Sequence, residues 1–149
     1  MVTVVTKTIG ITGRDYTTFT LAEAAVESIA TAEFGGTNLV TADGAIVFEA
    51  DAGTYSESVT FSSSLTTDAT RQVTYKPAAG SEHGGQSNAG ANLAGRPKVQ
   101  DNFTKLNALS LSLPSGTLEV DGSGAQVLDC VATATTGDSR VLDCRPVDN

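Results

Sequence analysis

Residues 45–61 constrain the fold more than any other stretch, because they hold two short strand patterns joined by a corner too tight for a helix. In the first pattern, apolar Ile46 and Phe48 alternate with Val and Glu, so that successive side chains lie on opposite faces of a strand. Residues 51–53, Asp-Ala-Gly, turn the chain, and a second alternation runs to Phe61. The stretch therefore predicts short strands separated by tight turns.

The composition indicates the same fold class. The chain is rich in Thr, Ser, Ala, Gly and Val, and it contains no Trp and three Tyr. Such a composition suits strands and turns better than a helical bundle, so we expect an all-β protein. At 149 residues the chain fits one domain, residues 1–149, with an N-terminal strand and a helix in residues 1–44 and the repeated strands in residues 45–149.

Charge and hydropathy disfavour nucleic acid and membrane as partners. The formal net charge is -8 and the sequence pI is near 4.4, and no Lys/Arg cluster offsets this charge. No run approaches the ~20 apolar residues that span a bilayer, and the first residues lack the pattern of a signal peptide. We therefore expect a soluble protein that folds in a cytoplasm.

One helix is predicted, after a first strand in residues 2–11. Thr20 is expected to be its N-cap, with Glu23 three residues later completing a capping box. The body, residues 21–32, places Leu21, Ala25 and Ile29 on one apolar stripe, with Ala22, Val26 and Ala30 beside it and the glutamates elsewhere. Gly35-Gly36 ends the helix.

Valines recur at a spacing typical of a solenoid. Taken as corresponding positions, four of them give steps of 26, 21 and 21 residues: Val73, Val99, Val120 and Val141. One more step back from Val73 ends near Phe48, and a second series joins Leu109 to Cys130, again 21 residues apart. The glycine-rich segment 78–95 interrupts the series, and we expect it to be an exposed insertion between Tyr75 and Val99.

The N-terminal half resembles a known family. Residues 13–24, which read Gly-Arg-Asp-Tyr-Thr-Thr-Phe-Thr-Leu-Ala-Glu-Ala, with residues 45–61 and 72–77, resemble the start of right-handed parallel β-helix proteins of the pectin-lyase-like family. Five residues match the family's corner pattern A-G-x-Y-x-E-S-V: Gly53, Tyr55, Glu57, Ser58 and Val59. The resemblance implies a short right-handed parallel β-helix of about four or five coils, with the predicted helix capping its open end.

The resemblance implies two classes of function, since this family includes both carbohydrate-active enzymes and phage virion proteins. The shortness of the predicted solenoid favours a virion structural protein, either a capsid decoration or a fibre-associated protein. We expect such a protein to bind a capsid or other virion protein, to assemble in the host cytoplasm, and to form a homo-oligomer, for instance a trimer. No catalytic residue, cofactor or metal is expected.

The alternative is a small polysaccharide lyase or hydrolase, or a non-catalytic carbohydrate-binding module. Clustered carboxylates and a cation would carry such chemistry, and the candidates are Asp121, Asp129 and Asp143 with Arg140 and Arg145. Asp129 and Asp143 each follow a leucine expected to point inward, so both would project from one outer face. Sugar binding would need aromatic stacking platforms, and aromatic residues are scarce.

The remaining reactive residues receive structural interpretations. His83 lies in the glycine-rich segment, where we expect a solvated loop histidine rather than a general base. Cys130 and Cys144 lack the spacing of a zinc site and are expected to be reduced and mostly buried. A hairpin around Gly137 is the alternative to a further solenoid coil, and it would make the two cysteines face each other.

Overall fold

The computed structural model describes residues 1–86, 89–114, 118–134 and 139–144, and from residue 133 onward it describes the backbone alone. The helices are α1 (Phe19–Phe34) and α2 (Leu39–Ala42). The strands are β1 (Thr3–Ile9), β2 (Gly44–Ala50), β3 (Gly53–Ser56), β4 (Thr60–Phe61), β5 (Val73–Pro77), β6 (Ala91–Ala94), β7 (Lys98–Val99), β8 (Lys105–Asn107), β9 (Ser110–Leu113), β10 (Glu119–Val120), β11 (Gln126–Ala134) and β12 (Ser139–Cys144). The predicted β-rich class is confirmed.

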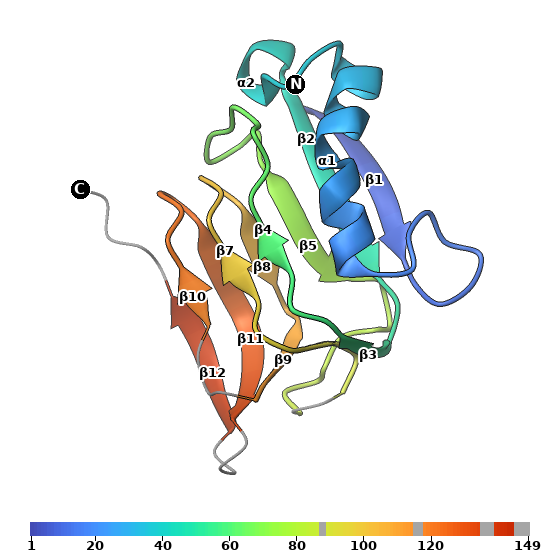
Figure 1. Ribbon diagram of the computed structural model, residues 1–149, viewed down its shortest axis with the longest axis vertical. Coiled ribbons are helices and arrows are strands. Elements are labelled where there is room, and N and C mark those ends of the chain that lie inside the picture. The colour runs from blue at the N-terminus through green and yellow to red at the C-terminus, as the bar shows by residue number, and fades with distance from the viewer. Residues whose placement is uncertain (87–88, 115–117, 135–138, 145–149) are drawn as a thin grey trace.

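The strands form two sheets (Figure 1). In the larger sheet eight strands follow the order β1-β2-β5-β8-β11-β9-β6-β3, and β12 is added beside β11. The smaller sheet has the order β10-β7-β4. All described strand pairs are parallel except that of β11 with β12. The chain thus passes three stacks of strands in the same order on each circuit: β2, β3, β4, then β5, β6, β7, then β8, β9, β10.

Aligned apolar residues fill the space between the stacks. Phe48, Tyr75, Leu106 and Val127 are neighbours in register on β2, β5, β8 and β11, and all four are fully buried. The rings of Phe48 and Tyr75 stack with centroids 4.9 Å apart. Because burying one such side chain stabilises a fold by about 1.5–3 kcal/mol, this row anchors the register of the whole sheet.

Helix α1 covers one end of these stacks, lying along β1 and β2 (Figure 1). Its N-cap is Thr18, whose Oγ1 accepts the backbone N–H of Leu21 at 3.1 Å, so the prediction of Thr20 as N-cap is wrong by two residues. Both threonines precede an apolar run, and tertiary contacts decide between them. The helix ends at Gly35, in the left-handed conformation, as predicted.

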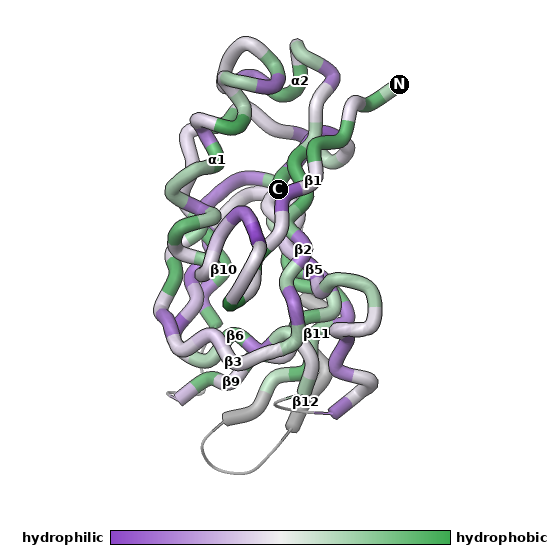
Figure 2. The backbone as a smooth tube through the Cα atoms, turned by 90° about the vertical axis from the view of Figure 1, so that its right-hand side faces the viewer, coloured by the Kyte–Doolittle hydropathy of each residue, from purple (hydrophilic) through white to green (hydrophobic). Residues whose placement is uncertain are grey.

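The buried face of α1 differs from the predicted stripe. Phe19, Ala22, Val26, Ile29 and Ala30 are buried, whereas Leu21 is 52% exposed, and Figure 2 shows hydrophobic and hydrophilic positions alternating along the helix. Phe19 belongs to this buried face, and its ring packs edge-on against Tyr55 with the centroids 5.0 Å apart. Ala22, Val26 and Ala30, which were predicted to lie beside the apolar stripe, are the residues that pack inward.

The valine register was predicted only in part. Val99 does lie beside Val120, and the 21-residue step from Leu109 leads to Cys130, since Ser110 is opposite Val131. Val73, however, lies in a different stack from Val99. It pairs with Ile46, which precedes it by 27 residues. An inward apolar residue recurs on every strand rather than once per circuit, so spacing alone cannot assign a residue to a stack.

The predicted insertion at 78–95 contains a core strand. β6 occupies residues 91–94, pairs with β3 and β9, and buries Ala91 and Leu93. The strand was missed because its four residues carry a single large apolar side chain between glycines. Residues 78–86, before β6, run outside the sheets.

The last strand is a hairpin partner and not a further coil. β12 runs antiparallel to β11, with Val141 opposite Val131, so the predicted step from Val120 to Val141 is wrong. Four residues separate the two strands, whereas a parallel crossover needs about a dozen or more. Cys130 is opposite Leu142, and its thiol is free and buried, as expected for a reduced cysteine. The side chain of Cys144 lies outside the described part of the chain.

Candidate functional site

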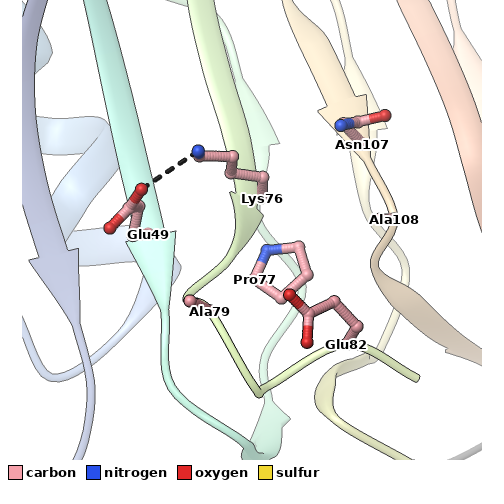
Figure 3. Close-up of a pocket in the computed structure, with 7 residues that line it drawn as sticks. All are labelled: Glu49, Lys76, Pro77, Ala79, Glu82, Asn107 and Ala108. Carbon is pink, nitrogen blue, oxygen red and sulfur yellow. Dashed lines mark ion pairs between the residues drawn. The ribbon is translucent and has the colours of Figure 1, made fainter. Parts of the chain in front are cut away.

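A hollow of about 220 Å³ lies on the outer face of the larger sheet, where the chain turns away beyond the end of β5 (Figure 3). Seven residues line it: Glu49, Lys76, Pro77, Ala79, Glu82, Asn107 and Ala108. Among the concave surfaces of the described residues, it combines charged groups of both signs with an apolar wall. We therefore consider it the candidate binding site.

The register of the sheet gathers the polar side of the hollow. Glu49, Lys76 and Asn107 each follow a buried residue of the Phe48–Tyr75–Leu106 row, so the alternation along each strand turns them outward. Lys76 Nζ lies 3.0 Å from Glu49 Oε1, and both side chains are about one third exposed. The three side chains thus form a polar row across neighbouring strands.

The segment opposite this row is tied to the corner after β2. The backbone N–H of Ala78 donates to the carbonyl of Ala50 at 2.7 Å, and Ser81 Oγ accepts the N–H of Ala52 at 2.9 Å. Ser81 is buried, and its carbonyl accepts the N–H of Ala91 at the start of β6. These bonds hold Glu82 over the hollow, with its carboxylate beside Pro77 (Figure 3).

His83 joins the same segment to β11. Its Nδ1 accepts the backbone N–H of Gly85 at 2.8 Å, so Nε2 carries the proton and donates to the carbonyl of Asp129 at 2.7 Å. His83 lies half-exposed in its loop, and the sequence did not predict that both ring nitrogens have partners within the protein. With both nitrogens engaged, this imidazole is a structural bridge and is poorly placed to act as a base.

The predicted acidic candidates do not gather in one place. Asp121 follows β10 of the smaller sheet, where its Oδ2 lies 3.3 Å from Lys98 Nζ, while Glu119 Oε1 lies 2.6 Å from the same ammonium. Asp129 is exposed on β11 of the larger sheet, with φ +51°, where the register with β12 shifts. Leu128 before it is half-buried rather than inward, because the shift interrupts the alternation.

The other two candidates are placed by backbone alone. Asp143 lies on β12 between the residues paired with Val127 and Cys130, so its backbone runs opposite Leu128 and Asp129. Arg140 is opposite Ala132, and Arg145 lies outside the described residues. The hairpin thus brings the Asp129 and Asp143 positions together and leaves Asp121 on the other sheet.

A second acidic group, which the sequence analysis missed, has a structural task. Three carboxylates accept the N–H groups of three consecutive serines: Glu23 from Ser62 at 2.8 Å, Asp101 from Ser63 at 2.7 Å and Glu27 from Ser64 at 2.8 Å. These bonds satisfy backbone donors on the chain that leaves β4 beneath α1. Glutamates four residues apart on one helix face were the available sequence signal.

Burial and hydrogen bonding shift the pKa values of this group in opposite directions. Desolvation raises the pKa of Glu23, against the lowering effect of its bonds to the Tyr75 hydroxyl and the Ser62 N–H. Desolvation also raises the pKa of Asp101. The pKa of exposed Glu27 is lowered, chiefly by the N–H of Ser64. The pKa values of Glu23 and Asp101 are thus shifted upward and that of Glu27 downward.

No group of three or more His, Cys, Asp or Glu side chains among the described residues is arranged to hold a metal ion. Neither described helix has the length and apolar character that crossing a bilayer requires.

No family model, no curated protein and no solved structure matches the chain.

Proposed function

We propose that the chain is a short right-handed parallel β-helix of the pectin-lyase-like kind that serves as a structural protein of a bacteriophage virion. A capsid decoration or a fibre-associated protein is the role that fits best. The order of the strands supports the β-helix, because the chain passes the three stacks in the same sequence on every circuit. β11 begins the fourth circuit.

The observation that carries the proposal is that residues of the matched corner pattern make structural hydrogen bonds. Glu57 receives the N–H groups of Phe19 and Thr20 at the start of α1, and the Tyr55 hydroxyl donates to the carbonyl of Asp51 at 3.0 Å. The residues that carry the resemblance thus hold helix α1 against the first circuit of strands. This arrangement supports a scaffold whose conspicuous side chains have structural tasks.

The predicted acids are divided between the two sheets. Cleavage of a glycosidic bond by paired acids needs two carboxyl groups within about 5–10 Å of each other across one groove. Asp121 lies apart on the smaller sheet and is paired with Lys98, which leaves Asp129 and Asp143, whose positions are opposite each other on the hairpin, as the pair that the enzymatic alternative would use. A glycan-binding role receives less support, since five of the eight aromatic rings are buried and the other three are half-buried.

The end of the larger sheet supports association with a partner. β12 pairs with β11 only, among the described strands, so its second edge offers backbone donors and acceptors. We propose that this end meets a capsid or other virion protein, or further copies of the chain in a homo-oligomer such as a trimer. The protein would then be assembled in the host cytoplasm and reside in the virion.

The test is whether the protein is part of a particle. Mass spectrometry of particles purified from the phage that encodes the chain is expected to find it, and the tagged protein should co-sediment with particles that lack their own copy. Analytical ultracentrifugation of the free protein reports the oligomeric state. A protein that stays monomeric and finds no particle contradicts the proposal.

The enzymatic alternative has its own readout. Incubation with acidic polysaccharides is expected to release neither unsaturated nor reducing sugars. Release that disappears in Asp129→Ala or Asp143→Ala would replace the virion proposal with a lyase or hydrolase. Binding on a glycan array without turnover would instead indicate a carbohydrate-binding module.

A further inference from the structure

We infer that the hollow on the larger sheet is a socket for one arginine side chain of the protein to which this chain binds. The inference rests on the proposed function, since it names the chemistry of the partner. The first observation is the volume of the hollow. At about 220 Å³ the hollow is smaller than the ~300–1,000 Å³ pockets that enclose a typical small molecule. A single long side chain suits this volume better.

The charges of the hollow favour a cation. Two carboxylates, those of Glu49 and Glu82, line the hollow together with a single ammonium, that of Lys76, which points to Glu49 (Figure 3). Lys76 is held by Glu49 at 3.0 Å, whereas the exposed carboxylate of Glu82 has no ion pair or hydrogen bond among the described residues. An anionic ligand would therefore have to compete with Glu49 for Lys76 and would meet Glu82. A cationic ligand would instead meet the carboxylate of Glu82, which has no ion pair among the described residues.

The geometry of the lining favours arginine over lysine. Glu82 offers both oxygens of its carboxylate to the hollow, and Asn107 places its side-chain amide on another wall (Figure 3). The planar guanidinium has five N–H donors in a fixed fork and can bond to both oxygens of one carboxylate, which a lysine ammonium does less well. Between them, Pro77, Ala79 and Ala108 supply an apolar wall for the methylene stem of the incoming side chain.

The charge of the whole chain fits the same partner. A net charge of -8 attracts a basic surface over long distances and speeds the encounter. The socket then fixes one arginine at short range. The partner is thus expected to present a basic segment with an arginine at its contact point.

The test uses N-acetyl-arginine amide as the probe, titrated into the 15N-labelled protein and followed by NMR. Saturable shifts are expected at the backbone amides around Lys76, Glu82 and Ala108, with weaker shifts for N-acetyl-lysine amide. Glu82→Gln is expected to weaken binding about tenfold, the effect of removing one charge-assisted hydrogen bond. Lys76→Met should strengthen binding, because it frees the carboxylate of Glu49.

Glu119→Gln is the matched control. It removes the same charge from an exposed glutamate on the smaller sheet, and it should leave the affinity for the probe unchanged. The inference is overturned if the shifts do not saturate, if Glu82→Gln behaves like Glu119→Gln, or if acetate or phosphate produces the same shifts as the arginine probe.

The particle assay separates this inference from the proposed function. If the protein co-sediments with particles and Glu82→Gln has no effect there, the socket is wrong and the virion role stands. If the probe binds as expected and no particle is found, the virion role is wrong and the arginine socket is supported. Loss of particle binding in Glu82→Gln, but not in Glu119→Gln, supports both.

Discussion

The carboxylate of Glu57 accepts the backbone N–H of Phe19 at 2.7 Å, across 38 residues of sequence. Its second oxygen accepts the N–H of Thr20 at 2.8 Å. The first turn of a helix leaves such donors without partners, and a negative charge there also interacts favourably with the helix dipole. Glu57, at the corner of the first circuit of strands, thus supplies acceptors for the N–H groups in the first turn of α1.

Replacing Glu57 by Gln should lower the free energy of unfolding by about 1–2 kcal/mol. The amide keeps one acceptor oxygen but loses the charge and the second acceptor. Urea unfolding followed by circular dichroism measures the change. Glu33→Gln, at an exposed site near the other end of α1, is the control and should stay within about 0.5 kcal/mol of the parent. Equal losses in the two variants would show that Glu57 does not hold the helix.

Two glycines are expected to tolerate no side chain. A Cβ at Gly95 would lie 2.0 Å from the carbonyl oxygen of Glu57, and one at Gly122 would lie 1.8 Å from that of Asp101. Because these neighbours are backbone atoms, Gly95→Ala and Gly122→Ala should each destabilise the fold by about 1–3 kcal/mol or more. At Gly36 nothing lies within 4 Å, so Gly36→Ala should be neutral or stabilising. Melting temperatures that do not separate the three variants would contradict the close approach of the circuits.

The stability of the protein should depend on pH with opposite signs at two glutamates of α1. The pKa of Glu23 is raised by desolvation, so its contribution favours folding while the group is protonated and is lost as pH rises through its folded-state pKa. The pKa of Glu27 is lowered, so its contribution is present above the ordinary glutamate pKa and is lost as pH falls through its folded-state pKa.

Melting curves between pH 3 and pH 8 measure both effects. Glu23→Gln should remove part of the loss on the alkaline side, and Glu27→Gln should remove part of the loss on the acidic side. Identical pH profiles for the two variants would mean that the two carboxylates do not occupy the environments described above.

The Cys130 thiol should be unreactive in the folded protein. It is fully buried, and burial raises its pKa to about 11, so very little thiolate is present at pH 8. In a Cys144→Ser variant, which leaves one thiol, Ellman's reagent should react slowly under native conditions and at once in urea. Fast reaction of the native variant would place Cys130 at the surface.

The sequence predicted those elements whose signals are local. The alternation in residues 45–61 and the glycine that ends α1 were both predicted, since each depends on neighbours within a few residues. β6 was missed because a short strand between glycines has almost no periodic signal of its own. Burial by β3 and β9 makes it a strand.

The candidate site was beyond the reach of the sequence. Glu49, Lys76 and Asn107 become neighbours only through the register of β2, β5 and β8, across loops of unequal length. Asp129 and Asp143 were predicted to share an outer face because each follows a leucine, and the structure places Asp129 at a shift in register on β11.

The sequence by itself determined that this chain forms short strands, one amphipathic helix and tight corners, because side-chain periodicity and turn residues act locally. Only the tertiary structure decided which strands are neighbours and that the last strand turns back on β11. It also decided that Glu57 rather than Glu23 accepts the backbone N–H groups in the first turn of α1. The physical reason is that register and backbone satisfaction depend on groups tens of residues apart, which meet only when the circuits stack.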